Sequence, residues 1–398
     1  MKRLLFLSHR IPYPPNKGDK IRSFHELQFL ARYFKLDLAT LVDDHKDLQF
    51  LSRLEKICEK VAVFPLNPFF SRLRALCSLF SYWPLSVRYF YSPSLDNIVK
   101  YWLSVKRYSL IFCFSSQTAQ YLPLNDIPFF MDFVDVDSEK WFQYSRRTKN
   151  PILKIFYRME GIRLRRFEIS VAKKARACIF SAQREANLFC RFFSDVNRVY
   201  TITNGVDFNY FSPFRHYSSP YPKNCFIILF SGAMDYYANI DGVLWFVKNV
   251  FPYVKSAIAN VKFYIVGRNP SSKIKKLSDD PDIEVTGFVE DIRPFYAHAH
   301  ICVAPLLVAR GIQNKILEAM AMGKPVVCTP QAFEGIDASP DIDILVAKNS
   351  QDFATKILSL LENPLKSKNI GEQARKTVEI KYSWERNLSS ILDLINAI

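Results

Sequence analysis

Short apolar runs alternate with longer amphipathic segments along the whole chain, and this alternation restricts the fold more than any other feature. An apolar run of about five residues is typical of a buried strand, and the amphipathic segments have the spacing of helices. The predicted strands are residues 4–8, 36–41, 61–65, 110–114, 129–133, 177–181, 199–202, 226–231, 262–266, 283–286, 301–304, 325–328 and 342–346. The predicted helices include residues 20–33, 152–174, 240–250, 314–322 and 352–362. This order predicts an α/β fold with parallel sheets and helices on both faces.

The alternation runs through two complete sets, which predicts two doubly wound domains. Between the sets lies a segment rich in Asn, Ser, Pro and Tyr, residues 204–221, as is typical of an interdomain connection. We expect residues 1–206 and 207–380 to form two Rossmann-like domains facing a central cleft. We expect residues 381–398 to form a helix that returns toward the first domain. In such sheets ligands bind at the carboxyl ends of the strands, near helix N-termini.

The composition argues against several classes of protein. Hydrophobic residues make up 49% of the chain, yet no stretch approaches the roughly 20 unbroken apolar residues of a membrane-spanning helix. The first apolar run is cut short by His9 and Arg10, so we predict a buried strand there and not a secretion signal. The eight cysteines form no C-x-x-C pair, which argues against a zinc site and a disulfide framework. A reducing cytoplasm is the simplest setting.

The basic excess of the chain lies in its first half. Residues 1–206 hold 33 Lys and Arg against 18 Asp and Glu, whereas residues 207–398 hold 21 and 20. This asymmetry suggests a polyanionic partner, either nucleic acid, an anionic membrane surface or a phosphate-bearing substrate; a solvated basic surface is the alternative. Residues 69–83 and 154–176 mix basic with aromatic and aliphatic residues, which suits an interfacial surface on anionic lipid or, equally, a core-facing helix with a solvated basic face.

One acid stands in an otherwise apolar helix start within V-A-R-G-I-Q-N-K-I-L-E-A-M-A-M-G-K-P, residues 308–325. A predicted strand ends shortly before it, and a loop with Gly311 leads into a helix that begins near Asn314. A helix start after glycine presents backbone N–H groups to an anion, and Arg310 and Lys315 add positive charge. Glu318 could accept hydrogen bonds from the two hydroxyls of a ribose. These features describe a nucleoside-diphosphate site; an ordinary surface helix with a solvated ion pair is the alternative.

The same segment resembles the nucleotide-sugar signature of the retaining glycosyltransferases of family 4, which have the GT-B fold. Three further segments are similar to motifs of that family: T-N-G-V-D-F-N-Y-F-S-P at 203–213, V-G-R-N-P with V-T-G-F-V-E-D-I-R-P-F-Y-A-H-A-H at 266–270 and 285–300, and Y-S-W-E at 382–385. R-I-P-Y-P-P-N-K-G-D-K-I-R-S-F-H at 10–25 and M-D-F-V-D-V-D-S at 131–138 resemble the subgroup associated with bacterial exopolysaccharide and exosortase (PEP-CTERM) systems. The resemblance implies transfer with retention of configuration and no metal or other cofactor.

The chain departs from the family pattern at two places. Family members carry two glutamates eight positions apart; Glu318 fills the second place, but Arg310 stands at the first. The usual Arg and Lys after the first strand of the second domain are also absent, and Gly232 and Asn239 lie in that region. We infer that Arg310 and Lys315 replace the missing cations. The predicted donor-binding residues are Glu318, Gly311, Ile312, Gln313, Asn314, Gly18 and Gly232; the predicted catalytic residues are Arg310, Lys315 and Asp135.

The first domain should supply the acceptor side of the site. Gly18 lies in a loop before a helix, where its backbone could approach a phosphate, with Lys20 and Arg22 nearby. Asp135 and Asp137 resemble a metal-binding D-x-D pair, but that motif belongs to the other large glycosyltransferase fold, so we expect them to orient acceptor hydroxyls. Capping of a helix is the alternative for Asp137. His9 follows the first strand and completes the predicted acceptor-side residues, which are His9, Lys20, Arg22 and Asp137.

The sequence therefore predicts a cytoplasmic glycosyltransferase of the hexosyltransferase type, peripheral on the inner face of the plasma membrane. Its predicted partners are a nucleotide-sugar donor, a glycan or lipid-linked acceptor and an anionic membrane surface. A nucleotide-sugar-binding protein with weakened catalysis is the first alternative, because the first glutamate is missing. A basic nucleic-acid-binding protein is the second, but no recognition motif for nucleic acid occurs, and we expect none to bind.

Overall fold

The computed structural model describes residues 2–122, 127–309 and 311–397. The chain forms two compact units, which are treated separately. Unit 1 comprises Met1–Thr203 and Leu388–Ile398, and unit 2 comprises Asn204–Asn387. The chain thus passes between the units after residue 203, where the sequence predicted a boundary after residue 206.

Unit 1 is built on a parallel sheet that, within the described residues, has seven strands in the order β3-β2-β1-β4-β5-β6-β7. The strands are β1 (Arg3–Ser8), β2 (Lys35–Val42), β3 (Lys60–Pro65), β4 (Leu110–Phe114), β5 (Phe129–Val134), β6 (Ala177–Phe180) and β7 (Val199–Thr201). The central strands are buried on both faces, as near-continuous apolar sequence requires. Leu5, Leu7, Ile111, Cys113 and Met131 belong to one core cluster of these strands.

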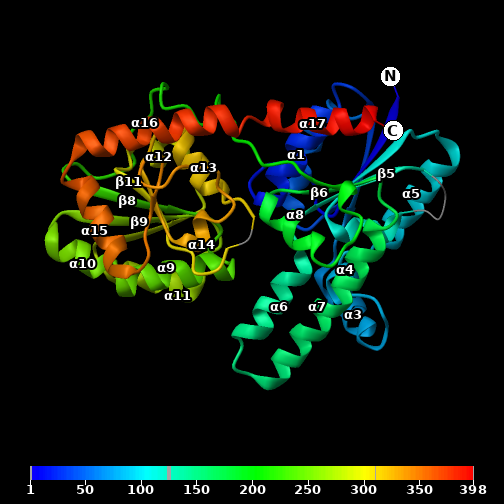
Figure 1. The fold of residues 1–398 in the computed structure, drawn as a ribbon, viewed down its shortest axis with the longest axis horizontal. Coiled ribbons are helices and arrows are strands. Elements are labelled where there is room, and N and C mark those ends of the chain that lie inside the picture. Colours follow the sequence, from blue (N-terminus) through cyan, green and yellow to red (C-terminus); the bar gives the residue numbers. More distant parts are fainter. Residues whose placement is uncertain (1, 123–126, 310, 398) are drawn as a thin grey trace. The chain divides into compact units, whose positions relative to one another are not determined.

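The helices of unit 1 cover this sheet and extend beyond it. They are α1 (Gly18–Leu30), α2 (Leu51–Glu55), α3 (Pro68–Cys77), α4 (Leu85–Tyr89), α5 (Pro93–Val105), α6 (Asp137–Arg147), α7 (Pro151–Ala172) and α8 (Gln183–Cys190). The short 3-10 turns are η1 (His45–Phe50), η2 (Ser78–Phe80), η3 (Ser116–Tyr121) and η4 (Val196–Arg198). Figure 1 shows α6 and α7 as a helical hairpin that projects from the sheet, with α3 at the same end.

Unit 2 has a second parallel sheet with the strand order β10-β9-β8-β11-β12-β13 in the described residues. Its strands are β8 (Phe226–Ser231), β9 (Val261–Val266), β10 (Ile283–Gly287), β11 (Ile301–Ala304), β12 (Val326–Cys328) and β13 (Leu345–Val346). This is the order of a doubly wound dinucleotide-binding fold, in which the strand order reverses beside the first strand. Ligands are therefore expected at the carboxyl end of β8, between β9 and β11.

Helices cover both faces of the unit 2 sheet (Figure 1). They are α9 (Tyr237–Asn249), α10 (Phe251–Ala257), α11 (Ser272–Lys275), α12 (Arg293–His298), α13 (Asn314–Ala321), α14 (Pro330–Phe333), α15 (Ser350–Leu361) and α16 (Pro364–Lys381), with the 3-10 turn η5 (Lys276–Asp279). Helix α17 (Trp384–Asn396) follows α16. Helix α17 begins in unit 2 and ends in unit 1. No helix in the described part of the chain is long and apolar enough to span a bilayer.

Two of the sequence motifs meet within unit 2, and a glycine makes their contact possible. The N–H of Val206 donates to the carbonyl oxygen of Tyr382 at 2.8 Å, and Val206 forms a bridge with Ser383. A Cβ atom on Gly205 would lie 2.5 Å from the backbone nitrogen of Trp384, so no other residue fits there without moving the backbone. The segments at 203–213 and 382–385 thus pack directly against each other through their backbones.

The predicted α/β fold with two Rossmann-like domains is confirmed. Each predicted strand is present, and most begin or end within one residue of the predicted bounds. Helices α4 and α5, between β3 and β4, were not among the predictions, and α3 overlaps the segment 69–83, for which a helix was one of two alternatives.

Candidate functional site

The loops that follow β8 and β9 pack backbone to backbone at the carboxyl edge of the unit 2 sheet. Gly232 has a φ of +153° and Gly267 a φ of +156°. A Cβ atom on Gly267 would lie 1.7 Å from the carbonyl oxygen of Gly232. A Cβ atom on Gly232 would lie 2.9 Å from Nζ of Lys315 and 2.8 Å from Nδ2 of Asn239. Glycine is therefore needed at both positions. The loop after β8 presents backbone without a side chain beside the ammonium group of Lys315.

Lys315, in the first turn of α13, supplies that cation. Its Nζ donates to Oδ1 of Asn239 at 2.7 Å and lies 4.1 Å from the centre of the Phe230 ring. Asn239 is itself oriented, because its Nδ2 donates to the carbonyl oxygen of Ala233 at 2.8 Å. Burial lowers the pKa of Lys315 to about 7, and the negative charge of Glu318 opposes this shift. Lys315 thus places an amine at the end of β8, where the loop itself carries no Arg or Lys.

Glu318 lies one turn further along α13 and is held by a buried tyrosine. Its Oε2 accepts a hydrogen bond from the hydroxyl of Tyr296 at 2.9 Å, and that hydroxyl is 2.6 Å from Oγ of Ser231, the last residue of β8. Tyr296 is 1% exposed, so its ring and hydroxyl are fixed. Burial raises the pKa of Glu318, whereas the Tyr296 hydrogen bond and the charge of Lys315 lower it. One oxygen of the carboxyl group is therefore held in a defined position.

The loop before α13 passes through a left-handed glycine. Gly311 has a φ of +61°, a conformation that favours glycine. Ile312 is buried and anchors the loop, and Gln313 is the N-cap residue of α13, although in the described part of the chain its side chain does not cap the first turn. Oδ1 of Asn314 accepts a hydrogen bond from Nδ2 of Asn204 at 3.1 Å, which ties the helix start to the linker motif.

Unit 2 therefore brings the predicted donor residues of its own half together at the carboxyl end of β8. An ammonium group and the N–H groups of a helix start attract a diphosphate. A fixed carboxylate beside them can accept hydrogen bonds from neighbouring hydroxyls. Arg310, predicted as a catalytic cation, lies outside the described residues.

In unit 1, His9 and Arg10 follow β1 and converge on Asp19 in the first turn of α1. Nη1 of Arg10 donates to Oδ2 of Asp19 at 2.6 Å, and Nε2 of His9 lies 3.5 Å from the same oxygen. Burial works against the charge of Asp19, but the hydrogen bond with His9 and the charge of Arg10 outweigh it and hold the pKa of Asp19 well below its usual value. His9 is 7% exposed and stacks on Phe114. Gly18 begins α1 beside this cluster.

Asp135 and Asp137 follow β5, and one lysine contacts both. Nζ of Lys140 lies 3.2 Å from Oδ2 of Asp135 and 2.9 Å from Oδ1 of Asp137. Asp137 is the first residue of α6, and Val136 occupies the N-cap position, so Asp137 is not the cap. Val134, just before them, has a φ of +67°, which is rare for a β-branched residue. Backbone strain of this kind concentrates at functional sites.

Two residues predicted for the acceptor side are placed in the interior of unit 1. Lys20 is 1% exposed and pairs with Asp47. Arg22 is fully buried, and its Nε lies 2.6 Å from Oδ2 of Asp132 and 3.0 Å from Oε1 of Glu26. A buried cation with carboxylate partners has no surface for a glycan hydroxyl. We therefore assign both side chains to the packing of unit 1 and correct their proposed contact with the acceptor.

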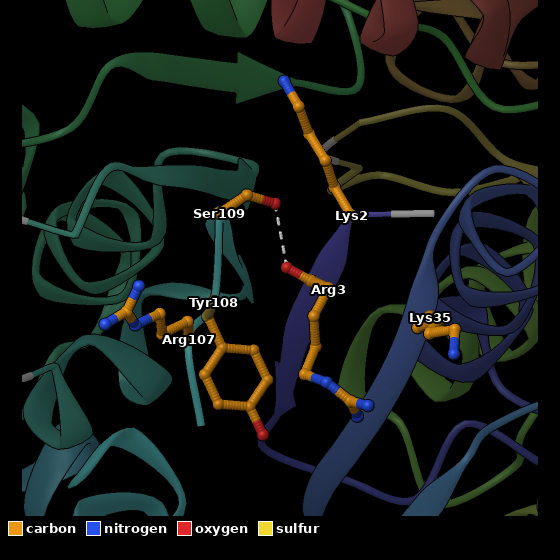
Figure 2. Close-up of a pocket in the computed structure, with 6 residues that line it drawn as sticks. All are labelled: Lys2, Arg3, Lys35, Arg107, Tyr108 and Ser109. Carbon is orange, nitrogen blue, oxygen red and sulfur yellow. Dashed lines mark hydrogen bonds between the residues drawn. The ribbon is translucent and has the colours of Figure 1, made fainter. Parts of the chain in front are cut away.

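An open hollow of about 550 Å³ lies at the opposite, amino edge of the unit 1 sheet. It is lined by Lys2, Arg3, Lys35, Arg107, Tyr108 and Ser109 (Figure 2). Oγ of Ser109 donates to the carbonyl oxygen of Arg3 at 2.9 Å, and the Arg3 side chain pairs with Asp37 and Glu59. Figure 2 shows Lys2 and Arg107 pointing in different directions. The basic residues do not converge, and the hollow lies away from the edge where parallel sheets bind ligands.

Sequence reasoning missed Tyr296, Ser231 and the role of Asn239. These residues orient Glu318 and Lys315, but a tyrosine, a serine and an asparagine at element ends are common in any sequence. The position of Ser231 and Asn239 beside the first strand of the second domain was the signal that could have identified them. Among the described residues no group of three or more His, Cys, Asp and Glu side chains is arranged to hold a metal ion.

Comparison with known proteins bears on the fold and on part of the sequence. Residues 225–363 match the family described as "Glycosyl transferases group 1". Over its full length the chain is 16% identical to HepE of Anabaena in a complex with UDP, with a TM-score of 0.69 and complete coverage of both chains. It is also 16% identical to sucrose-phosphate synthase of Thermosynechococcus elongatus, with a TM-score of 0.74, covering 100% of this chain and 99% of the other.

The chain has the GT-B fold. A curated relative from Klebsiella pneumoniae, described as "Uncharacterized 44.6 kDa protein in cps region", is 25% identical over 172 residues. That match covers 41% of this chain and less than half, 44%, of the relative.

Proposed function

We propose that this GT-B chain is a retaining glycosyltransferase of family 4, of the hexosyltransferase type. It moves a sugar from a nucleoside-diphosphate donor to a hydroxyl of a glycan or lipid-linked glycan. The observation that carries the proposal is that Lys315 and Glu318 lie one turn apart on α13 at the carboxyl end of β8, where Asn239 holds the amine and Tyr296 holds the carboxyl group. The match of residues 225–363 to "Glycosyl transferases group 1" supports it.

In this proposal the donor lies on unit 2 in a defined orientation. The diphosphate is bound by Lys315 and by the N–H groups at the start of α13, beside the bare backbone of Gly232. The ribose hydroxyls donate to Glu318. HepE, which shares the fold, has been solved in complexes with UDP and with UDP-glucose. We therefore choose UDP-glucose as the first donor to test.

The transfer step needs no group beyond the donor, the acceptor and this chain. The bond between the anomeric carbon and the diphosphate oxygen breaks, and a bond to the acceptor oxygen forms on the same face of the sugar. The acceptor proton passes to the leaving diphosphate oxygen. Lys315 stabilises the charge that develops on the diphosphate, and Arg310 is proposed to add a second cation. The remaining rate enhancement comes from holding the two substrates in position.

The acceptor is proposed to be a precursor of an exopolysaccharide or another cell-surface polysaccharide. The Klebsiella relative is described as lying in the cps region, and another GT-B structure with similar architecture is WaaG, "a glycosyltransferase involved in lipopolysaccharide biosynthesis". His9, which follows β1, and Asp135, which follows β5, both lie at the carboxyl edge of the unit 1 sheet and are our candidates for contacts with its hydroxyls. The proposal places the protein in the cytoplasm, a reducing compartment that suits eight cysteines with no C-x-x-C pair.

One observation favours a second function. Arg310 occupies the position of the first family glutamate, so the chain could bind a sugar nucleotide without transferring the sugar. Release of the nucleoside diphosphate from the donor, with and without glycan acceptors, separates a transferase from such a binding protein.

The test is a thermal-shift screen with UDP, GDP and ADP sugars, followed by calorimetric titration of the sugar nucleotide that gives the largest shift. We expect Glu318→Gln and Lys315→Met to weaken binding at least tenfold, because each removes a group that contacts the donor. Glu362→Gln and Lys276→Met, at exposed positions of the same unit, are the matched controls and should bind as the wild type does. If no sugar nucleotide binds, or if the site variants bind as tightly as the controls, the proposed donor site is refuted.

A further inference from the structure

Helix α3 is amphipathic in the reverse sense, because it buries small residues and exposes large apolar ones. Ser71 and Ala75, one turn apart, form its buried face. The large apolar side chains on its other face are exposed: Phe69 (70%), Phe70 (57%), Leu73 (50%) and Leu76 (54%). At 100° per residue these four lie on one side of the helix. An ordinary surface helix turns such a stripe toward the core, so this face is built to meet something outside the chain.

Two other segments of unit 1 also expose large apolar side chains. Tyr82 is 95% exposed and Trp83 is 40% exposed in the loop after η2. On α7, Ile152, Ile155 and Ile162 are 76%, 70% and 38% exposed, and their spacing places them along one stripe of the helix. The surface formed by these three residues, Tyr82, Trp83 and the exposed face of α3 is called the α3–α7 face below.

Contacts within unit 1 hold the parts of this face together. Nη2 of Arg163 on α7 donates to the carbonyl oxygen of Leu79 at 2.8 Å. The ring of Trp83 lies 5.6 Å from the ring of Phe167, also on α7. Helices α6 and α7 pack closely, because a Cβ atom on Gly161 would touch the Phe142 ring at 3.1 Å. Figure 1 shows α3 and the α6–α7 hairpin at the same end of unit 1.

The charge around the face is positive. Residues 61–95 and 140–159 contain no Asp or Glu, and these two segments carry the hairpin tip and all of the face except Ile162. The basic residues of the two segments are Arg72, Arg74, Arg88, Lys140, Arg146, Arg147, Lys149, Lys154 and Arg158. An apolar surface with exposed Tyr and Trp and a surround of Lys and Arg complements a bilayer that carries anionic headgroups.

We propose that the α3–α7 face docks on an anionic membrane surface, with Phe69, Phe70 and Ile155 entering the headgroup region. A neutral or basic protein partner would also cover apolar residues, but it would gain nothing from two basic segments that contain no Asp or Glu. The inference adds to the proposed function by stating where an acceptor anchored in lipid would be met. It is tested without donor or acceptor, so its failure leaves the proposed transferase standing, and the reverse also holds.

The experiment is flotation of the full chain with vesicles of phosphatidylcholine, with and without phosphatidylglycerol, at low and high salt. The apolar variant is Phe69→Ser, Phe70→Ser, and its matched control is Phe288→Ser, Leu365→Ser at exposed positions of unit 2. The charge variant is Lys149→Glu, Lys154→Glu, Arg158→Glu, and its control is Lys273→Glu, Lys275→Glu, Lys276→Glu, also exposed. Circular dichroism checks that each variant is folded.

We expect the wild type and both controls to float with phosphatidylglycerol vesicles and not with pure phosphatidylcholine. Reversing three basic charges should lower the partition constant by at least about a hundredfold, because loss of each cation alone accounts for roughly fivefold near an anionic surface. The apolar variant should lose binding even at low salt. The proposal is overturned if the wild type does not float, or if both variants float as their controls do. It is also overturned if the face instead mediates self-association, seen by sedimentation as a dimer that the apolar variant dissociates.

Discussion

The sharpest prediction concerns the pH dependence of sugar-nucleotide binding, because burial lowers the pKa of Lys315 to about 7. If the protonated amine binds the diphosphate, affinity follows the fraction of Lys315 that is charged in the free protein. That fraction is about one half at pH 7 and about 1% at pH 9 for a pKa near 7. The affinity for UDP-glucose should therefore fall roughly fiftyfold over this range, or about 2.3 kcal/mol. The diphosphate of UDP-glucose stays fully ionised from pH 7 to pH 9, so it adds nothing to the change of affinity with pH.

The sign of this effect separates Lys315 from its neighbour Glu318. The pKa of Glu318 is raised by burial, so a rise in pH ionises it and should strengthen binding of ribose hydroxyls. A fall in affinity with rising pH therefore reports the lysine. The bound diphosphate should also raise the pKa of Lys315, and about one proton should be taken up per ligand bound at pH 8.

Calorimetric titration from pH 6 to pH 9 in buffers of different ionisation enthalpy measures both quantities. Lys315→Arg keeps its charge across this range, so its affinity should not vary with pH, whatever its absolute value. Lys315→Met should bind weakly at every pH. A wild-type affinity that is flat from pH 7 to pH 9, or a Lys315→Met variant that keeps the same slope, would refute the reasoning.

Two further predictions test the framework that holds the site. Tyr296→Phe removes the hydroxyl that orients Glu318, and we expect it to lower stability by about 1–3 kcal/mol and to weaken UDP-glucose binding; unchanged affinity would show that the carboxyl group needs no such support. Gly205→Ala places a Cβ atom 2.5 Å from the backbone of Trp384 and should cost about 3 kcal/mol or more in urea unfolding. Gly287→Ala, whose Cβ atom would meet nothing within 4 Å, should cost only about 1 kcal/mol from its backbone conformation, and equal losses would argue against the packing explanation.

Much of the fold could be predicted because each parallel strand buried on both faces has a recognisable local sequence pattern. A short apolar run between turn residues is visible without knowledge of its neighbours. The division into two domains followed from the repetition of this pattern and from the Pro-rich and Ser-rich linker. The segment around Glu318 was identified because strand, glycine loop and helix are consecutive in the chain.

The parts that sequence reasoning missed are those that depend on distant residues. Lys20 and Arg22 were expected on the acceptor side because they lie near the loop at Gly18, but Asp47 and Asp132, far along the chain, compensate them inside unit 1. The contact of Tyr296 with Glu318 likewise joins two helices that are separate in the sequence. No periodicity or motif records such pairs.

Helix α3 reverses the usual relation between side-chain size and tolerance to substitution. Replacing Ser71 or Ala75 by a larger residue should push the helix away from the residues it packs on, because these two small side chains form its buried face. Replacing Phe69 or Leu73 by a polar residue should leave the folded state intact and even improve solubility. In a map of tolerated substitutions, the small residues of this helix should therefore be the intolerant positions and its large apolar residues the tolerant ones. Any selection that keeps its outer phenylalanines must come from the cell and not from the requirements of folding.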